Sequence, residues 1–188
     1  MDSYYTPILT LTFHINGEAM IQKPKIKNIL VATDLSQNAE HAFTYAVGMA
    51  EAHGAQITIL NVIEKMDPNT ELLLTALLEY GSTAELKRNT ETDLIVRIKA
   101  YIEAFCASAS DDAAQCTTMI RDIVVNHGDV VERILHFAGT GNYDLLIMGS
   151  RGLGIVKEAL MGGTSRKVVL HSPIPVLIVP YKKEDHPQ

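Results

Sequence analysis

The chain has 188 residues, of which 47% are hydrophobic and 20% are charged, and these values are typical of one compact soluble domain. Its formal net charge of -6 and its pI near 5.6 argue against DNA or RNA as the main partner, because nucleic-acid surfaces need clustered positive charge. Cys106 and Cys116 are too few for a disulfide-stapled secreted scaffold, and they have no matching CxxC or histidine pair for zinc. We therefore expect both cysteines to be reduced thiols.

The N-terminal region carries no recognisable targeting signal. It lacks a basic segment, contains Asp2, and its apolar stretch from Ile8 to Phe13 is short and interrupted. We therefore expect a cytoplasmic protein with no membrane partner. Residues 1–24 form an extension before the first strand, and LTLTFHI within it alternates like an edge strand that could pair with a sheet or another chain. Met20 could also be the natural start of the protein.

Short β-rich runs alternate with helical patterns along the rest of the chain. The run from Asn28 to Thr33 is mostly apolar, as in a strand buried on both faces. Apolar residues then recur at helical spacing from Ala39, and the helix is expected to end near His53-Gly54. Further strands are predicted at Gln56–Ile63, Met119–Val125, Asp144–Met148 and Val176–Val179, with helices at Asp129–Ala138 and Ser165–Leu170.

This alternation predicts an α/β fold in which right-handed crossovers build a parallel sheet covered by helices on both faces. The segment 67–110 is longer than one crossover requires, and it contains two helical patterns broken near Gly81-Ser82. We interpret it as a helical insertion within a domain spanning residues 25–188. A lid or a partner surface is the alternative interpretation of this insertion.

The turn after the fourth predicted strand is rich in glycine, and ligands of open parallel sheets bind beyond the carboxyl ends of such strands. Glycine lets backbone N–H groups approach a phosphate, and the start of the next helix adds partial positive charge. The pattern is not a Walker A motif, because Thr164 follows Gly163 where lysine is required, and it also fails GxGxxG. Its spacing is Gly149, two residues, Gly152, nine residues and Gly162.

With this spacing the chain resembles the universal stress protein family, whose nucleotide-binding members carry G-x2-G-x9-G-[ST] after the fourth strand. The resemblance covers roughly residues 25–180 and rests on KNILVATDLS, ITILNVIE, HGDVVERIL, YDLLIMGSRG and SPIPVLIVP in that order. It implies a single Rossmann-like domain with a five-stranded, mainly parallel sheet of order 3-2-1-4-5. It also implies an adenine nucleotide between the first and fourth strand ends, and a homodimer paired through Val176–Val179.

Carried over by position, the resemblance implies a set of nucleotide-binding residues. Those expected to face adenine and ribose are Ala32, Thr33 and Asp34, and the residue expected to pack against the base is Val62. Those expected around the phosphates are Met148, Gly149, Arg151, Gly152, Gly162, Gly163, Thr164 and Ser165.

The chain departs from the family motif at Gly163, where the motif has Ser or Thr. A hydroxyl contact to the terminal phosphates is lost there, although the glycine N–H still donates and Thr164 or Ser165 could substitute. The implied ligand is therefore ATP, with ADP and AMP as alternatives, and a Mg²⁺ ion could accompany the phosphates.

Several of these residues also have a purely structural interpretation. Asp34 and Gln37 have the spacing of a capping box, so the Asp34 carboxylate could simply cap a helix. The glycines could be turn residues, although a plain strand-to-helix loop needs only about two to six residues. Arg151 could be a solvated charge, and Val62 and Met148 could belong to the core. Gly128-Asp129 is most simply a strand end followed by a helix cap.

Other chemistries find little support in the sequence. The histidines lack metal-ligand spacing, MGSRG fails the GxSxG hydrolase pattern, and no carboxylate or lysine is placed to activate water on a γ-phosphate. We expect at most weak ATP hydrolysis. Two functions remain: a cytoplasmic adenine-nucleotide-binding regulator or sensor of the stress response, and a homodimeric interaction module of the same fold that has lost nucleotide binding. An adenylating enzyme of a related superfamily would need an added catalytic motif.

Overall fold

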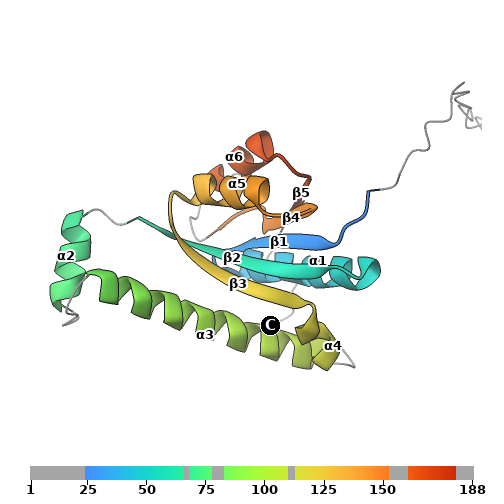
Figure 1. Ribbon diagram of the computed structural model, residues 1–188, viewed down its shortest axis with the longest axis horizontal. Coiled ribbons are helices and arrows are strands. Elements are labelled where there is room, and N and C mark those ends of the chain that lie inside the picture. Colours follow the sequence, from blue (N-terminus) through green and yellow to red (C-terminus); the bar gives the residue numbers. More distant parts are fainter. Residues whose placement is uncertain (1–23, 66–67, 78–82, 110–112, 153–160, 181–188) are drawn as a thin grey trace, which may run out of the picture.

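A computed structural model describes residues 24–65, 68–77, 83–109, 113–152 and 161–180 (Figure 1). The predicted edge strand LTLTFHI lies outside these residues and stays a prediction, as does the division into an extension at residues 1–24 and a domain at 25–188.

The core of the molecule is a five-stranded parallel sheet of order β3-β2-β1-β4-β5, which confirms the predicted α/β fold and strand order. The strands are β1 (Asn28–Thr33), β2 (Gln56–Glu64), β3 (Ile120–Gly128), β4 (Leu145–Gly149) and β5 (Val176–Val179). The inner residues of β1 and all of β4 are buried, because helices cover both faces of these central strands. The third strand begins one residue later and ends three residues later than predicted.

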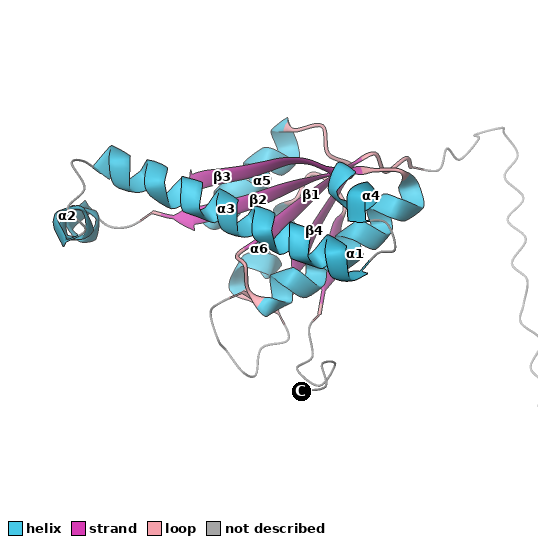
Figure 2. Cartoon of the chain, turned by 90° about the horizontal axis from the view of Figure 1, so that it is seen from below, coloured by secondary structure: helices cyan, strands magenta, loops and turns pink. Residues whose placement is uncertain are grey.

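Helices cover the two faces of the sheet in separate groups (Figures 1 and 2). One apolar cluster packs α1 and α3 against the sheet, and a second packs α5 and α6 against the opposite face. The helices are α1 (Gln37–His53), α2 (Pro68–Leu77), α3 (Thr83–Ala109), α4 (Ala113–Thr118), α5 (Val130–Thr140) and α6 (Gly163–His171). None of the helices in the described residues is long and apolar enough to cross a membrane.

The first helix does not begin with the predicted capping box. Its N-cap is Ser36, whose Oγ accepts a hydrogen bond from the Ala39 N–H at 3.3 Å. Asp34 lies two residues earlier and its Oδ1 accepts from the Ser36 N–H at 3.1 Å, so the prediction that Asp34 caps the helix is wrong. The reason is local: the chain turns once more after Asp34, at Leu35, which has a positive φ of 61°.

The cap predicted for the helix after the third strand is confirmed. Asp129 is the N-cap of α5, and its Oδ1 accepts from the Glu132 N–H at 2.9 Å. Gly128, which precedes it, has a φ of 152° that favours glycine.

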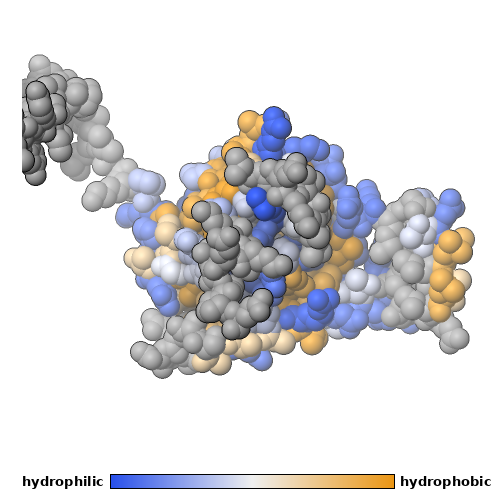
Figure 3. All heavy atoms as spheres, turned by 180° about the vertical axis from the view of Figure 1, so that it is seen from behind, coloured by the Kyte–Doolittle hydropathy of each residue, from blue (hydrophilic) through white to orange (hydrophobic). Residues whose placement is uncertain are grey.

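The long segment between β2 and β3 folds as helices, as its periodicity predicts. Its second helix, α3, is about 40 Å long at 1.5 Å per residue and lies along the sheet with Ile98 and Ile102 buried (Figure 1). The first helix, α2, lies near the beginning of α3, and Figure 3 shows apolar surface there, where Leu72 and Leu77 are exposed. The short α4 was not predicted.

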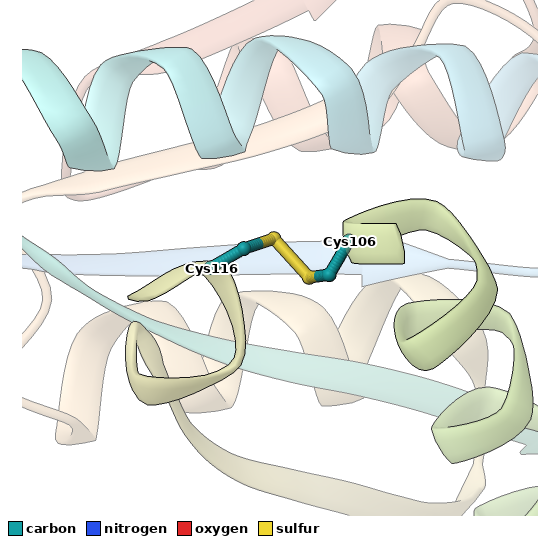
Figure 4. The surroundings of a disulfide bond; sticks show 2 residues. All are labelled: Cys106 and Cys116. Atoms are coloured by element: carbon teal, nitrogen blue, oxygen red, sulfur yellow. A yellow bond between two sulfur atoms is a disulfide. The ribbon is translucent and has the colours of Figure 1, made fainter. Parts of the chain in front are cut away.

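The two cysteines form a disulfide bond, so the prediction of reduced thiols is wrong (Figure 4). Cys106 lies near the end of α3 and Cys116 lies in α4, with Cα atoms 5.6 Å apart. The chain reverses between these helices and brings together two cysteines that are ten positions apart. Neither the spacing of the cysteines nor the expected compartment indicates that the chain reverses here.

Candidate functional site

A cavity of about 310 Å³ lies at the carboxyl ends of the strands, between the end of β1, the end of β4 and the start of α6. The chain order of the sheet reverses between β1 and β4, so the connections that leave these strands diverge to opposite faces and leave an opening. All the residues that the sequence predicted for the site line it: Ala32, Thr33, Asp34, Val62, Met148, Gly149, Arg151, Gly152, Gly162, Gly163, Thr164 and Ser165. Their role in binding a nucleotide stays a prediction.

Five further residues line the cavity and were missed: Ala39, Leu60, Glu64, Val130 and Ile134. Glu64 ends β2 one residue beyond the predicted strand end, so a better strand boundary would have indicated it. Val130 and Ile134 lie one helical turn apart at the start of α5, on the apolar face that packs against the sheet. That periodicity marks them as core residues, and only the position of α5 brings them to the cavity.

Side-chain hydrogen bonds fix the tight turn that follows β1. The Thr33 Oγ1 accepts from the Leu35 N–H at 3.1 Å, and the Asp34 Oδ1 accepts from the Ser36 N–H at 3.1 Å. The buried side chain of Asn61, from β2, donates its Nδ2–H to the Thr33 carbonyl at 2.9 Å. Because three side chains hold this backbone, the Asp34 carboxylate has a fixed position beside the cavity.

The exit of β4 passes close to this turn and to the first residues of α1. A Cβ on Gly152 would collide with the Asp34 carboxylate. A Cβ on Gly149 would lie 3.0 Å from the Asn38 carbonyl oxygen. Glycine at these two positions therefore lets the backbone after β4 approach the exit of β1.

The start of α6 lines the cavity with backbone N–H groups that have no acceptor within the helix. Its N-cap is Gly162, which has no side chain to cap the helix, and the Gly162 N–H itself donates to the Ser150 carbonyl at 2.8 Å. The next N–H groups, of Gly163, Thr164 and Ser165, occupy the first turn, where an α-helix has no internal acceptors for them. A helix start of this kind favours an anion.

Arg151 adds a side-chain donor to the same cavity. Its Nε is buried and has no hydrogen-bond partner among the residues that the structure describes. A buried donor without a partner is costly, by about 1 to 3 kcal/mol, so an acceptor in the cavity would stabilise this arrangement.

The sequence of the whole domain matches a known family, since the family model described as "Universal stress protein family" aligns with residues 25–180. The chain belongs to the universal stress protein family. It is 34% identical over 153 residues to the "Universal stress protein in QAH/OAS sulfhydrylase 3'region" of Thermus aquaticus, an alignment that covers 81% of this chain and 98% of the relative. A putative universal stress protein of Staphylococcus aureus is 28% identical over 165 residues, covering 81% of this chain and 83% of the relative.

Solved structures share the fold of this universal stress protein. The universal stress protein UspA from Lactobacillus plantarum superimposes with a TM-score of 0.61 at 25% identity, covering 84% of this chain and 99% of that one. The hypothetical protein MJ0577 gives a TM-score of 0.65 at 22% identity, covering 85% and 99%. At that identity the second likeness shows the fold alone.

Gly163 lacks the hydroxyl of the family motif, and the two residues that follow it, Thr164 and Ser165, differ in the hydrogen bonds that their hydroxyls make. In this universal stress protein Ser165 is buried, and its Oγ–H donates to the Gly149 carbonyl at 2.9 Å, tying α6 to the end of β4. Thr164 is half-buried, lines the cavity, and its hydroxyl is not engaged by another described residue. Of the two substitutes that the sequence allowed, Thr164 is therefore the one with a hydroxyl hydrogen to offer.

The space around Gly163 is open, since a Cβ there would meet nothing within 4 Å. Packing therefore does not require glycine at position 163, unlike at positions 149 and 152.

Within the described residues there is also no cluster of three or more His, Cys, Asp or Glu side chains that could hold a metal ion. The carboxylates of the cavity, Asp34 and Glu64, come from the ends of two different strands.

Proposed function

We propose that this universal stress protein binds an adenine nucleotide in the cavity between β1, β4 and α6, and that it acts as a regulator or sensor in the stress response. The observation that carries the proposal is the meeting of two kinds of donor in one cavity. The first turn of α6 has no side-chain cap, and the Arg151 Nε has no hydrogen-bond partner among the described residues, so both suit an anion.

Part of the cavity lining is apolar, which suits a base. Leu60 and Val62 of β2 and Val130 and Ile134 of α5 belong to one apolar cluster. A ligand with a flat apolar end and an anionic end would therefore have a complement for each part. That combination favours a nucleotide over inorganic phosphate or a purely apolar molecule.

Asp34 lines the same cavity and is the proposed ribose contact. Its Oδ1 accepts from the Ser36 N–H, and its Oδ2 faces Gly152. A carboxylate oxygen held in this way can accept a hydrogen bond from a ribose hydroxyl. Its charge repels phosphate, which orients the sugar toward Asp34 and the phosphates toward α6.

Thr164 is the proposed side-chain contact to the phosphates, together with Arg151. Ser165 contributes its backbone N–H and positions α6 through its bond to Gly149. With a glycine at 163, one hydroxyl contact fewer is available to the outer phosphates. We propose ATP, ADP and AMP as ligands of one site, with Mg²⁺ accompanying the longer phosphate chains.

Thermal melting with each adenine nucleotide tests the proposal. A ligand that binds only the folded protein stabilises it by about 2.7 kcal/mol at a free concentration of about 100 times Kd, so ATP, ADP or AMP should raise the Tm. If no adenine nucleotide at millimolar concentration raises the Tm and none co-purifies, the nucleotide proposal fails. The same fold would then be serving as an interaction module.

A pair of variants at Gly163 sharpens the phosphate assignment. Gly163→Ser restores a hydroxyl in open space and should strengthen ATP binding more than AMP binding. Gly163→Ala adds the same Cβ without the hydroxyl and is the matched control. Equal gains with serine and alanine would contradict a hydroxyl contact to the outer phosphates.

We also propose that two copies pair through the free edge of β5. The strand is apolar along its length, and the neighbouring α6 exposes Val169 and Leu170. The carbonyls of Pro175 and Val179 accept from β4, so by strand alternation the Ile178 N–H points to the open edge. Sedimentation should give a dimer, and the Ile178 amide should exchange slowly in the dimer and rapidly after dilution. A monomer at all concentrations tested would refute the pairing.

A further inference from the structure

The carboxyl end of β2 carries an acidic side chain on the cavity side of the sheet. Successive side chains of a strand point to opposite faces, so Leu60, Val62 and Glu64 share one face of β2. All three line the cavity, and both Leu60 and Val62 contribute to the apolar cluster that contains Ile134 of α5. The Glu64 carboxylate therefore follows directly on the apolar side chains against which the base is proposed to pack.

Glu64 and the donors of the site lie on opposite sides of β1. In the sheet β2 and β4 flank β1, and both Arg151 and the start of α6 come after β4. Neighbouring strands are about 4.8 Å apart, so about 10 Å separates β2 from β4. A nucleotide with its phosphates at α6 and its base against β2 crosses the end of β1, which keeps the charge of Glu64 away from the phosphates.

The strand register brings Glu64 beyond the turn that follows β1. Thr33 pairs with Asn61, so Glu64 lies three residues, or about 10 Å, further along β2. Its neighbour across the ladder is Gly128, so no side chain of that residue stands beside it. Glu64 is exposed, and a ligand in the cavity can reach its carboxylate without displacing a packed residue.

A carboxylate in this position has one complement on adenine. An ionised carboxylate only accepts hydrogen bonds. The exocyclic N6 amine of adenine donates, whereas guanine has the acceptor O6 in the same place on the ring. A carboxylate that faces this place therefore binds adenine and disfavours guanine.

We propose that Glu64 accepts a hydrogen bond from the N6 amine of the bound base and so selects adenine over guanine nucleotides. The inference rests on the proposed function, because it requires a nucleotide in this cavity. Glu64 is exposed and the contact competes with water, so we expect a factor of about three to ten in Kd, below the range for a buried hydrogen bond to a charged group.

Calorimetric titration of the full-length protein with three nucleotides tests the role of Glu64. The nucleotides are ATP, GTP and purine ribonucleoside triphosphate, which has a hydrogen atom in place of the amine. The Kd of this analogue should be about three to ten times that of ATP, and GTP should bind more weakly than ATP. An equal Kd for ATP and the analogue, or binding of GTP as tight as that of ATP, would overturn the inference.

Two alanine variants assign the selectivity to a residue. Glu64→Ala should bring ATP and the analogue to the same Kd. The lost charge affects both triphosphates alike, so the ratio of the two Kd values isolates the contact with the amine. Glu51→Ala is the matched control, because it removes an exposed carboxylate of α1 that does not line the cavity, and it should keep the ratio of the unmodified protein. A Glu64→Ala variant that keeps this ratio would overturn the role of Glu64.

Failure of this inference and failure of the proposed function are distinguishable. If none of the three nucleotides binds, nucleotide binding itself is refuted, and the role of Glu64 with it. If ATP binds but its Kd depends on neither the amine nor Glu64, the proposed function stands and only the role of Glu64 is refuted.

Discussion

The cavity at the strand ends and the α3–α4 corner are built by opposite means. The cavity is shaped mainly by the backbone, since Gly152 allows a close approach and the first turn of α6 offers N–H groups. The corner between α3 and α4 is held by side chains, through a covalent bond between Cys106 and Cys116 within an apolar cluster. A ligand site can therefore be lost with the fold intact, whereas damage to the corner should affect stability and leave the cavity unchanged.

Loss of the disulfide should have the largest effect on stability. A bond that closes a ring of about ten residues stabilises a protein by about 3 kcal/mol, mainly through the unfolded chain. The double variant Cys106→Ser, Cys116→Ser should lose this amount in urea denaturation measured under oxidising conditions. The Tm increase caused by nucleotide should persist in the variant. A variant that keeps its stability but no longer responds to nucleotide would reverse the proposed division of roles.

Gly152→Val should remove the nucleotide effect, about 2.7 kcal/mol at 100 times Kd, with a smaller loss of stability in the free protein. Any Cβ here collides with the Asp34 carboxylate, which also displaces the proposed ribose contact. Melting with and without ATP measures both quantities. Gly48→Ala is the control, because a Cβ in that position of α1 meets nothing within 4 Å. An unchanged Tm increase in Gly152→Val would place the ligand elsewhere.

Ser165→Ala and Thr164→Ala should distinguish a hydroxyl that positions α6 from a hydroxyl that contacts the phosphates. The alanine at 165 removes a buried hydrogen bond and leaves the Gly149 carbonyl without it, which should cost about 1 kcal/mol in the absence of ligand. The alanine at 164 should leave the stability of the free protein nearly unchanged and weaken ATP binding more than AMP binding. Urea denaturation and calorimetric titration measure the two effects. Identical behaviour of the variants would contradict the distinction between these hydroxyls.

The smallest predicted effect is the contribution of Tyr101 to stability at alkaline pH. Burial, reinforced by the nearby charge of Glu40, raises the pKa of the Tyr101 hydroxyl from 10.0 to about 12. Between pH 10 and 12 the unfolded chain therefore loses this proton while the folded protein keeps it, so stability falls as the pH rises through that range. Tyr101→Phe should show a shallower decline in urea denaturation over this range. A decline as steep as in the unmodified protein would assign the effect to other groups.

Much of the fold could be predicted from local patterns in the sequence, and most of the cavity lining followed from the resemblance to the universal stress protein family. The apolar run of β1 marks a strand buried on both faces, and Pro175 and Pro180 delimit β5 at its observed residues. The glycines at 149 and 152 mark a close approach of the backbone, which the structure contains. Each of these patterns lies within a few consecutive residues, so it can be recognised without knowledge of the rest of the chain.

Other features depend on parts of the chain that meet only after folding. Ser36 caps α1 because an extra turn follows Asp34, and Ser165 bonds to Gly149 because α6 starts beside the end of β4. The disulfide requires the reversal between α3 and α4, which no sequence motif predicts. Sequence determined the five strands, the longer helices and the glycines that allow a close approach of the backbone, since those preferences are local. Tertiary structure decided which hydroxyl is free, which cysteines meet and which core residues reach the cavity, because those outcomes depend on distances between remote segments.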